Sequence, residues 1–259
     1  MRPRPRPLAA TADGIALALS WLTVLPVRVP SGAVDRGRAR RAISAAPAVG
    51  ALMGAVTAGV LWCTMHAGLS PALAGLLAVG LLALLTRGMH VDGLADTVDG
   101  LGCYGPPERA LEVMRSGGAG PFAVAAMVVV LGGQAVALGE LAEASQWAAV
   151  VLTVAAGRVA TVLACRRGVG PATPSGFGAL VAGTQHPVAL GAWVIAAIAA
   201  AVAAVPGRAW QGPVIVVAVL AATAAFVAHC TRRFGGVTGD VLGAVIEGAT
   251  VLTAAALTL

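Results

Sequence analysis

The sequence is poor in charged residues. Asp, Glu, Lys and Arg make up 11% of its 259 residues, whereas ordinary soluble domains contain about 25%. Hydrophobic residues account for 58%, and the mean hydropathy is +0.88. This shortage of polar surface excludes an ordinary soluble domain. We therefore predict an all-α fold, a polytopic bundle of integral membrane helices, because helices satisfy their own backbone hydrogen bonds in lipid.

Lysine is absent, so all 17 basic residues are arginines. The net charge of +6 could indicate a nucleic-acid ligand. The arginines, however, lie between apolar runs and do not form one continuous stripe. We therefore expect them to set the orientation in the membrane, and we expect no nucleic-acid partner.

Only four cysteines are present, and they stand far apart in the chain. Without a C-x-x-C pair, the sequence indicates neither a zinc site nor a disulfide scaffold. We expect these side chains to act as small buried hydrophobic residues.

Long apolar segments are abundant, and seven of them approach the length of about 20 residues that a membrane-spanning helix needs. A shorter apolar segment, Thr11 to Val27, carries Asp13 and ends near Pro26. We predict a short N-terminal helix there that lies in the membrane plane or re-enters it. The basic stretch before it, 1–11, has no clear cleavage site and is expected to be retained. The seven expected spans are 42–66, 70–86, 119–139, 147–165, 187–206, 213–231 and 240–259.

Arginines are distributed unequally between the two sets of loops that these spans define. One set holds twelve arginines, and the opposite set holds one, Arg208. This asymmetry predicts that the arginine-rich loops face the cytoplasm. The loops with convergent polar residues fall on the same side, which favours an enzyme with soluble substrates over a transporter. The arginine-rich loops are 28–41, 87–118, 166–186 and 232–239.

An acidic segment punctuated by glycines runs from His90 to Glu112 and is predicted to be a loop. Asp92, Asp96 and Asp99 fall within eight residues of it, at spacings that would place them on one face of a helix. Like charges at this density require a cation, a water-rich surface or protonation. Carboxylate oxygens without a thiolate favour Mg²⁺. We predict that the three aspartates hold magnesium, with a solvated acidic segment as the alternative.

A second polar cluster lies near the C-terminus, from Arg232 through two adjacent glycines to Asp240. Arg232 and Arg233 could bind phosphate, or they could be a basic flank followed by a capping aspartate. Two further charged residues, Arg158 and Glu247, fall inside expected spans. Because charges at this depth are costly, we expect them to be functional or paired, and we hypothesise that they pair with each other.

Three segments together resemble the cobalamin synthase family, adenosylcobinamide-GDP ribazoletransferase, and the resemblance extends over almost the whole chain. They are His90-Val-Asp-Gly-Leu-Ala-Asp-Thr-Val-Asp-Gly100, Glu112-Val-Met-Arg115 and Gly235-Gly-Val-Thr-Gly-Asp-Val-Leu-Gly-Ala244. The resemblance implies one membrane-embedded catalytic domain, 1–259, in the bacterial inner membrane. It implies a Mg²⁺-dependent reaction that joins adenosylcobinamide-GDP to α-ribazole, or its 5′-phosphate, and releases GMP.

The resemblance also implies roles for individual residues. Asp92, Asp96 and Asp99 would hold the metal and the diphosphate, and Asp240 would complete the catalytic site or act on the incoming hydroxyl. Segment 116–120 and Val24 depart from the family, which often has a further Asp and Arg in the former and an Arg in the latter. The residues expected to contact substrate are His90, Glu112, Arg115, Arg158, Arg232 and Arg233.

Other functions remain open at the level of sequence. The acidic segment is loosely similar to that of lipid phosphotransferases that use CDP-alcohols, although its spacing differs. A small-solute permease and a purely structural membrane subunit are further alternatives. The sequence leaves a homo-oligomer open.

Overall fold

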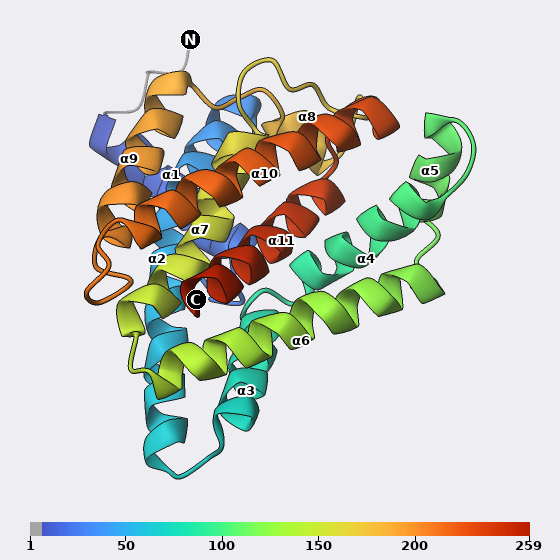
Figure 1. Cartoon of the computed structure of the whole chain (residues 1–259). Coiled ribbons are helices and arrows are strands. Elements are labelled where there is room, and N and C mark those ends of the chain that lie inside the picture. The colour runs from blue at the N-terminus through green and yellow to red at the C-terminus, as the bar shows by residue number, and fades with distance from the viewer. Residues whose placement is uncertain (1–6) are drawn as a thin grey trace.

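The computed structural model describes residues 7–259, with side chains from Thr11 onward. Arg2, Arg4 and Arg6 therefore lie outside the described residues. In this range the regular elements are helices (Figure 1), which confirms the predicted all-α class. Their bounds are α1 Pro7–Leu22, α2 Arg36–His66, α3 Pro71–Leu85, α4 Met89–Gly102, α5 Pro107–Met114, α6 Pro121–Glu143, α7 Trp147–Ala164, α8 Phe177–Val181, α9 Pro187–Ala201, α10 Gln211–Phe234 and α11 Gly239–Leu257.

Within the described chain, five helices are long and apolar enough to cross a membrane: α2, α6, α7, α10 and α11. The protein is therefore a multi-pass membrane protein. A sixth crossing requires α3 and α4 together, which meet at a bend of 93°. The predicted number of about seven spans is not confirmed. The expected spans 70–86 and 187–206 contain helices α3 and α9 of only 15 residues, too short for a hydrocarbon core of about 30 Å.

The acidic segment differs most from expectation. It is not a loop: α4 and α5 occupy most of it, joined by a short connection that contains Pro106. A left-handed Gly88 precedes α4, and its neighbour Arg87 has a φ of +56°, which is unusual for a residue with a side chain. These two residues turn the chain sharply between α3 and α4. The aspartates are consequently carried on a helix that leaves α3 at a bend of 93°.

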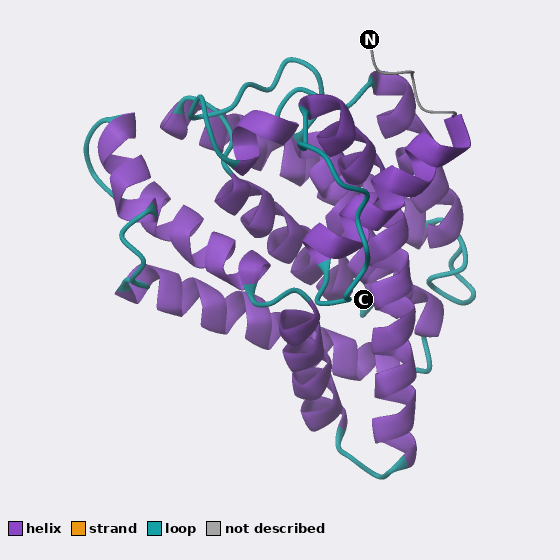
Figure 2. Ribbon diagram, turned by 180° about the vertical axis from the view of Figure 1, so that it is seen from behind, coloured by secondary structure: helices purple, strands orange, loops and turns teal. Residues whose placement is uncertain are grey.

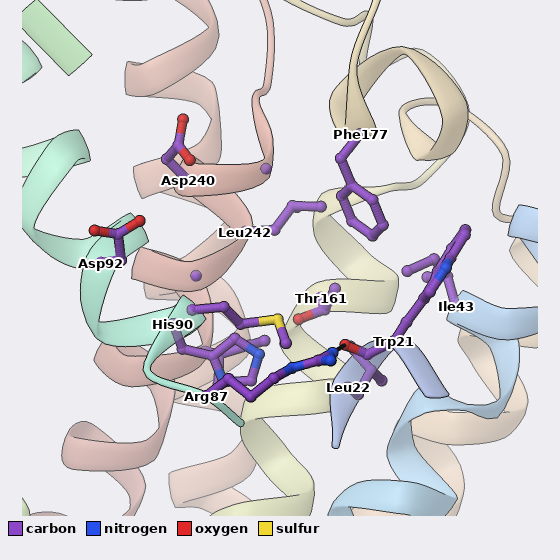
Figure 3. Close-up of a pocket in the computed structure, with 14 residues that line it drawn as sticks. Trp21, Leu22, Ile43, Arg87, His90, Asp92, Thr161, Phe177, Asp240 and Leu242 are labelled. Carbon is purple, nitrogen blue, oxygen red and sulfur yellow. Dashed lines mark hydrogen bonds between the residues drawn. The ribbon is translucent and has the colours of Figure 1, made fainter. Parts of the chain in front are cut away.

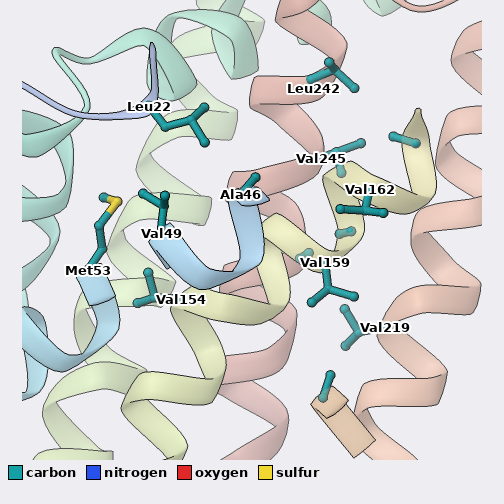
Figure 4. Packing of buried hydrophobic residues seen from close by; sticks show 14 of the residues in the cluster. Leu22, Ala46, Val49, Met53, Val154, Val159, Val162, Val219, Leu242 and Val245 are labelled. Carbon is teal, nitrogen blue, oxygen red and sulfur yellow. The ribbon is translucent and has the colours of Figure 1, made fainter. Parts of the chain in front are cut away.

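Small residues allow the central helices to pack closely, as expected for helices in lipid. A Cβ atom on Gly50 would lie 3.1 Å from the Cα of Ala155, and one on Gly54 would lie 2.8 Å from the carbonyl oxygen of Val151. Figure 4 shows Val49 of α2 beside Val154 of α7 in the buried core that this contact creates. The expectation that the cysteines are buried holds for two of them, whereas Cys63 is exposed and Cys103 is partly exposed.

The short helix α1 is tied to the beginning of α2. The carboxylate of Asp13 accepts hydrogen bonds from Arg38 at 2.7 Å and Arg41 at 3.4 Å. The hydrogen bond from Arg38 holds the pKa of the Asp13 carboxyl below its ordinary value. Another arginine of α2, Arg36, donates to the carbonyl oxygens of Ala179 and Ala182 next to α8. Helices α1 and α8 are thereby both attached to the beginning of α2.

The arrangement of the helices gathers several helix ends at one side of the molecule. The hairpin of α2 and α3 projects at the opposite side, as both views show (Figures 1 and 2). The end of α4, α5, α8 and the beginning of α11 lie away from this hairpin (Figure 1). The polar segments that the sequence singled out therefore meet at one side of the bundle.

Candidate active site

A contact between α4 and α11 brings Asp92 beside Asp240. A Cβ atom on Gly93 would lie 2.7 Å from the carbonyl oxygen of Asp240, and one on Gly243 would lie 3.0 Å from that of His90. The two glycines therefore permit an approach that side chains would prevent. Figure 3 shows the carboxylates of Asp92 and Asp240 close together at one side of a cavity.

The glycine-rich segment before α11 places Asp240 in the first turn of that helix. Gly235 ends α10 in the left-handed conformation with a φ of +79°. Gly236 packs against Pro171, where a Cβ atom would lie 2.3 Å from the carbonyl carbon. The hydroxyl of Thr238 accepts a hydrogen bond from the backbone amide of Val241 and caps α11. The sequence of this segment is thus explained by the turn that it makes.

A cavity of about 380 Å³ opens in front of Asp92 and Asp240. We call it the aromatic cavity, because Trp21 and Phe177 form its far wall, with ring centroids 5.1 Å apart and planes inclined at 69°. Figure 3 shows these rings opposite the two carboxylates. Its lining residues are Trp21, Leu22, Ile43, Arg87, Met89, His90, Asp92, Thr161, Phe177, Gly239, Asp240, Leu242, Gly243 and Ile246.

A second cavity, of about 450 Å³, lies on the other side of Asp240. We call it the polar cavity, because Arg115 and several hydroxyl groups line it. Arg115 lies close enough to Asp240 to attract its carboxylate. Asp240 and Phe177 border both cavities, so the two spaces meet at them. The residues of the polar cavity are Leu111, Met114, Arg115, Thr173, Ser175, Gly176, Phe177, Gly178, Thr238, Gly239 and Asp240.

The three aspartates of α4 have different surroundings. Asp96 lies close enough to Asp92, Asp99 and Asp240 to be repelled by each of them. Asp99 faces the beginning of α6, where its oxygens accept hydrogen bonds from the backbone amides of Gly120 at 2.6 Å and Ala123 at 3.1 Å. Within the described residues, no group of three or more His, Cys, Asp and Glu side chains is arranged to hold a metal ion. Magnesium binding by the three aspartates stays a prediction, and Asp99 also caps a helix.

Arg158 and Glu247, the two charged residues predicted to lie inside membrane spans, belong to a buried polar cluster beside the aromatic cavity. Gln134 donates a hydrogen bond of 2.6 Å to the carboxylate of Glu247, and the His90 ring lies 3.9 Å from the same carboxylate. Arg158 is buried and donates to the carbonyl oxygen of Val154. It lies close enough to Glu247 to be attracted, but the two form no salt bridge among the described side chains. The hypothesised direct pair of Arg158 with Glu247 is therefore not formed, and the two side chains instead share a cluster with His90 and Gln134.

Several predicted substrate contacts lie outside both cavities. Glu112 is exposed and pairs with Arg109 at 3.1 Å. Arg233 donates a hydrogen bond of 2.6 Å to the carbonyl oxygen of Cys103, and so connects α10 with the end of α4. Arg232 is exposed and borders neither cavity, and the buried Arg158 borders neither. Of the predicted substrate-binding residues, His90 and Arg115 do border a cavity.

The structure also places residues in the site that sequence reasoning missed. Arg87 borders the aromatic cavity and donates hydrogen bonds to the carbonyl oxygens of Ser20 and Trp21, at 3.2 and 3.3 Å. Its position directly before the acidic run was the only signal for it. Trp21 and Phe177 come from segments far apart in the sequence, and no periodic pattern connects them.

Comparisons with known proteins agree with the resemblance. The profile of the cobalamin-5-phosphate synthase family matches residues 14–258. A relative from Nocardioides sp. is 42% identical over 93% of this chain and 96% of its own length. A relative from Frankia casuarinae is 37% identical over 92% of this chain and 90% of its own length. A relative from Corynebacterium efficiens is 36% identical over 92% of this chain and 88% of its own length. All three are named adenosylcobinamide-GDP ribazoletransferase. No solved structure matches the chain.

Proposed function

The chain belongs to the cobalamin-5-phosphate synthase family and is a transferase of the cobalamin pathway, and we propose that it transfers the cobinamide phosphate group in a Mg²⁺-dependent reaction. The substrates would be adenosylcobinamide-GDP and α-ribazole or its 5′-phosphate. The products would be adenosylcobalamin, or its 5′-phosphate, and GMP.

One observation carries this proposal: Asp240 stands at the junction of two cavities of different chemistry. A transfer between two small molecules needs one binding space for each, with the reacting atoms held together where the spaces meet. Carboxylates at that junction suit the transfer of a phosphorus-containing group, for which positioning and charge neutralisation matter most.

The donor atoms of the site fit magnesium. Asp92 and Asp96 supply carboxylate oxygens, and the described residues place no arginine in a salt bridge with either of them. Magnesium is usually held by one or two carboxylates, with waters and substrate phosphates as the other ligands. A protein cluster of three ligands is therefore not needed. When bound, the ion would neutralise the diphosphate and stabilise the leaving GMP.

The protein's own groups would then position and deprotonate the reactants. Arg115 would bind oxygens of the diphosphate from the polar cavity. The hydroxyl of α-ribazole would attack the phosphorus that carries cobinamide, and the bond from that phosphorus to the oxygen of the GMP phosphate would break. Asp240, which borders both cavities, is placed to accept the hydroxyl proton. The buried polar cluster of His90 and Glu247 would hold α4 against α11.

We further propose that this side of the molecule faces the cytoplasm of a bacterial cell, in the inner membrane. The arginine distribution supports this orientation. The cavities are bordered by the segments that contain these arginines, and soluble substrates would reach them from there.

The experiment that tests the proposed function is an assay of the purified full chain in lipid nanodiscs. Adenosylcobinamide-GDP and α-ribazole are supplied with and without Mg²⁺, GMP is followed, and the product is identified by mass spectrometry. We expect GMP and a corrinoid product in equal amounts, and only with Mg²⁺. Absence of GMP and of a corrinoid product in the presence of Mg²⁺ would refute the assignment. Parallel assays then test the alternatives, with a CDP-alcohol as substrate for a phospholipid product and with liposomes for uptake of an unchanged solute.

A further inference from the structure

The aromatic cavity has two chemically different ends. Asp92 and Asp240 stand at one end, and Trp21 and Phe177 stand at the other (Figure 3). Aliphatic side chains complete the second end. The guanidinium of Arg87 also reaches this end, where it donates to the backbone carbonyl oxygens of Ser20 and Trp21. These aliphatic residues are Leu22, Ile43 and Leu242.

The size of this cavity limits what can enter it. Its volume of about 380 Å³ lies near the lower end of the roughly 300–1,000 Å³ typical of small-molecule sites. A corrin macrocycle, with its amide side chains and adenosyl group, is far too large. The candidates that remain are the three flat bases of the substrates: guanine, the adenine of the adenosyl group and the dimethylbenzimidazole of α-ribazole.

Polarity decides among these bases. Guanine and adenine each carry several donors and acceptors, and each one that is buried without a partner is destabilising. The aromatic end offers few partners, since the hydroxyl of Thr161 already donates to the carbonyl oxygen of Gly157 at 3.1 Å and the guanidinium of Arg87 already donates to the carbonyl oxygens of Ser20 and Trp21. Dimethylbenzimidazole is apolar except for its ring nitrogens, one of which is bonded to ribose. It loses little on burial and gains contact with aromatic rings.

We propose that the aromatic cavity binds the benzimidazole base of α-ribazole against Trp21 and Phe177, an inference that rests on the proposed function. The ribose then extends toward Asp92 and Asp240. The polar cavity, with Arg115 and its hydroxyl groups, binds the guanosine diphosphate part of the other substrate. The attacking hydroxyl and the diphosphate meet at Asp240, which borders both cavities.

This assignment gives the N-terminal helix a function. Trp21 lies near the end of α1, and the hydrogen bonds of Arg87 to the carbonyl oxygens of Ser20 and Trp21 hold that end over the cavity. The attachment of Asp13 to Arg38 holds the other part of α1 on α2. The helix is thus a wall of the base-binding site.

The test measures KM for each substrate with the full chain in nanodiscs. Trp21→Ala should raise the KM for α-ribazole about tenfold, because stacking on an aromatic side chain contributes roughly 1–3 kcal/mol per base. The KM for adenosylcobinamide-GDP should stay within about twofold of wild type. Trp21→Phe keeps an aromatic face and should restore most of the affinity. Arg115→Ala should instead raise the KM for adenosylcobinamide-GDP and leave the KM for α-ribazole within about twofold of wild type. Trp210 is an exposed tryptophan at the start of α10, and Trp210→Ala is the matched control that should change neither KM.

Titration calorimetry with α-ribazole alone separates this inference from the proposed function. If wild type makes product but Trp21→Ala raises only the KM for adenosylcobinamide-GDP, or neither KM, the base assignment is wrong and the proposed function stands. If wild type makes no product but binds α-ribazole in a manner that Trp21→Ala weakens, the proposed function is wrong and the base assignment stands. Absence of both product and α-ribazole binding overturns both.

Discussion

Single residues of the site differ in what surrounds them, although the sequence makes them look alike. Asp92 and Asp240 border the aromatic cavity, and Asp96 lies close enough to both to be repelled. Asp99 instead accepts hydrogen bonds from two backbone amides at the beginning of α6. Substitutions that remove a charge without changing size should therefore separate the aspartates into two groups.

Asp92→Asn and Asp96→Asn are expected to lower GMP release about 100-fold or more. Each removes a carboxylate that would hold the magnesium ion, and the ion would neutralise the diphosphate. Asp99→Asn should lower GMP release much less. It should instead destabilise the protein by about 1–3 kcal/mol, because asparagine has only one acceptor oxygen and leaves one of the two backbone amides without its partner. GMP release and thermal unfolding are measured on the same preparations. Equal losses of activity for all three variants without destabilisation of Asp99→Asn would show that Asp99 is a ligand like the others.

The two arginines near the end of the acidic segment should also behave differently. Arg115 borders the polar cavity, whereas Arg109 forms an exposed pair with Glu112. Exposed pairs contribute about 0–1 kcal/mol, so Arg109→Ala should leave turnover within about twofold of wild type. Arg115→Ala should reduce kcat/KM about tenfold or more, as the loss of a charged hydrogen bond does. The reverse order in steady-state kinetics would contradict the assignment of the polar cavity.

At the scale of elements, the contact between α4 and α11 is what brings the acidic groups together. A Cβ atom on Gly93 would lie 2.7 Å from the carbonyl oxygen of Asp240, whereas nothing lies within 4 Å of one on Gly248. Both glycines are helical, and in a helix alanine is ordinarily more stable than glycine by about 0.5–1 kcal/mol. Gly93→Ala and Gly248→Ala are therefore matched substitutions, which differ in whether the added methyl group meets a neighbouring helix.

Gly93→Ala should push α4 and α11 apart and reduce GMP release at least about tenfold, since small displacements of reacting groups are costly. Gly248→Ala should keep wild-type activity and be as stable or more stable. Activity and thermal unfolding are compared for both. If Gly93→Ala is as active as Gly248→Ala, close helix contact does not set the site.

Much of the element structure could be predicted from the sequence. The hydrophobic runs predicted the long helices, whereas the partner that packs against Gly50 and Gly54, helix α7, is seen only in the structure. The shorter α3 and α9 and the helical α4 could not be predicted in this way. Their ends depend on local turns such as that at Arg87 and Gly88, and on contacts with helices distant in sequence.

At the scale of the whole molecule, the site is assembled from segments that lie far apart in the sequence and meet at one side of the bundle. The acidic run and the arginines before α11 carried signals that chemistry alone could interpret, because charged side chains are uncommon in lipid. The aromatic wall carried no such signal, since Trp21 and Phe177 resemble ordinary core residues until the fold places them together. The sequence therefore predicts candidate reacting groups, whereas it did not predict the cavities that those groups border.

The proposed orientation predicts which loops can be labelled from each side of the membrane. In a variant without the four native cysteines, Ser116→Cys should react with a membrane-impermeant maleimide only in inverted vesicles, because it lies beside α5. Ala144→Cys, between α6 and α7, should react only in spheroplasts. Both positions are exposed. The opposite pattern would place the site outside the cytoplasm.

The central claim is that the carboxylates at the α4–α11 contact hold a divalent ion on a nucleotide diphosphate. Binding of Mn²⁺, as a spectroscopic substitute for Mg²⁺, can be measured by electron paramagnetic resonance with wild type and Asp92→Asn, each with and without adenosylcobinamide-GDP. We predict that the nucleotide substrate increases Mn²⁺ binding to wild type at least about tenfold, and that Asp92→Asn loses this increase. Equal binding by the two proteins, in the presence of the nucleotide substrate, would contradict the account.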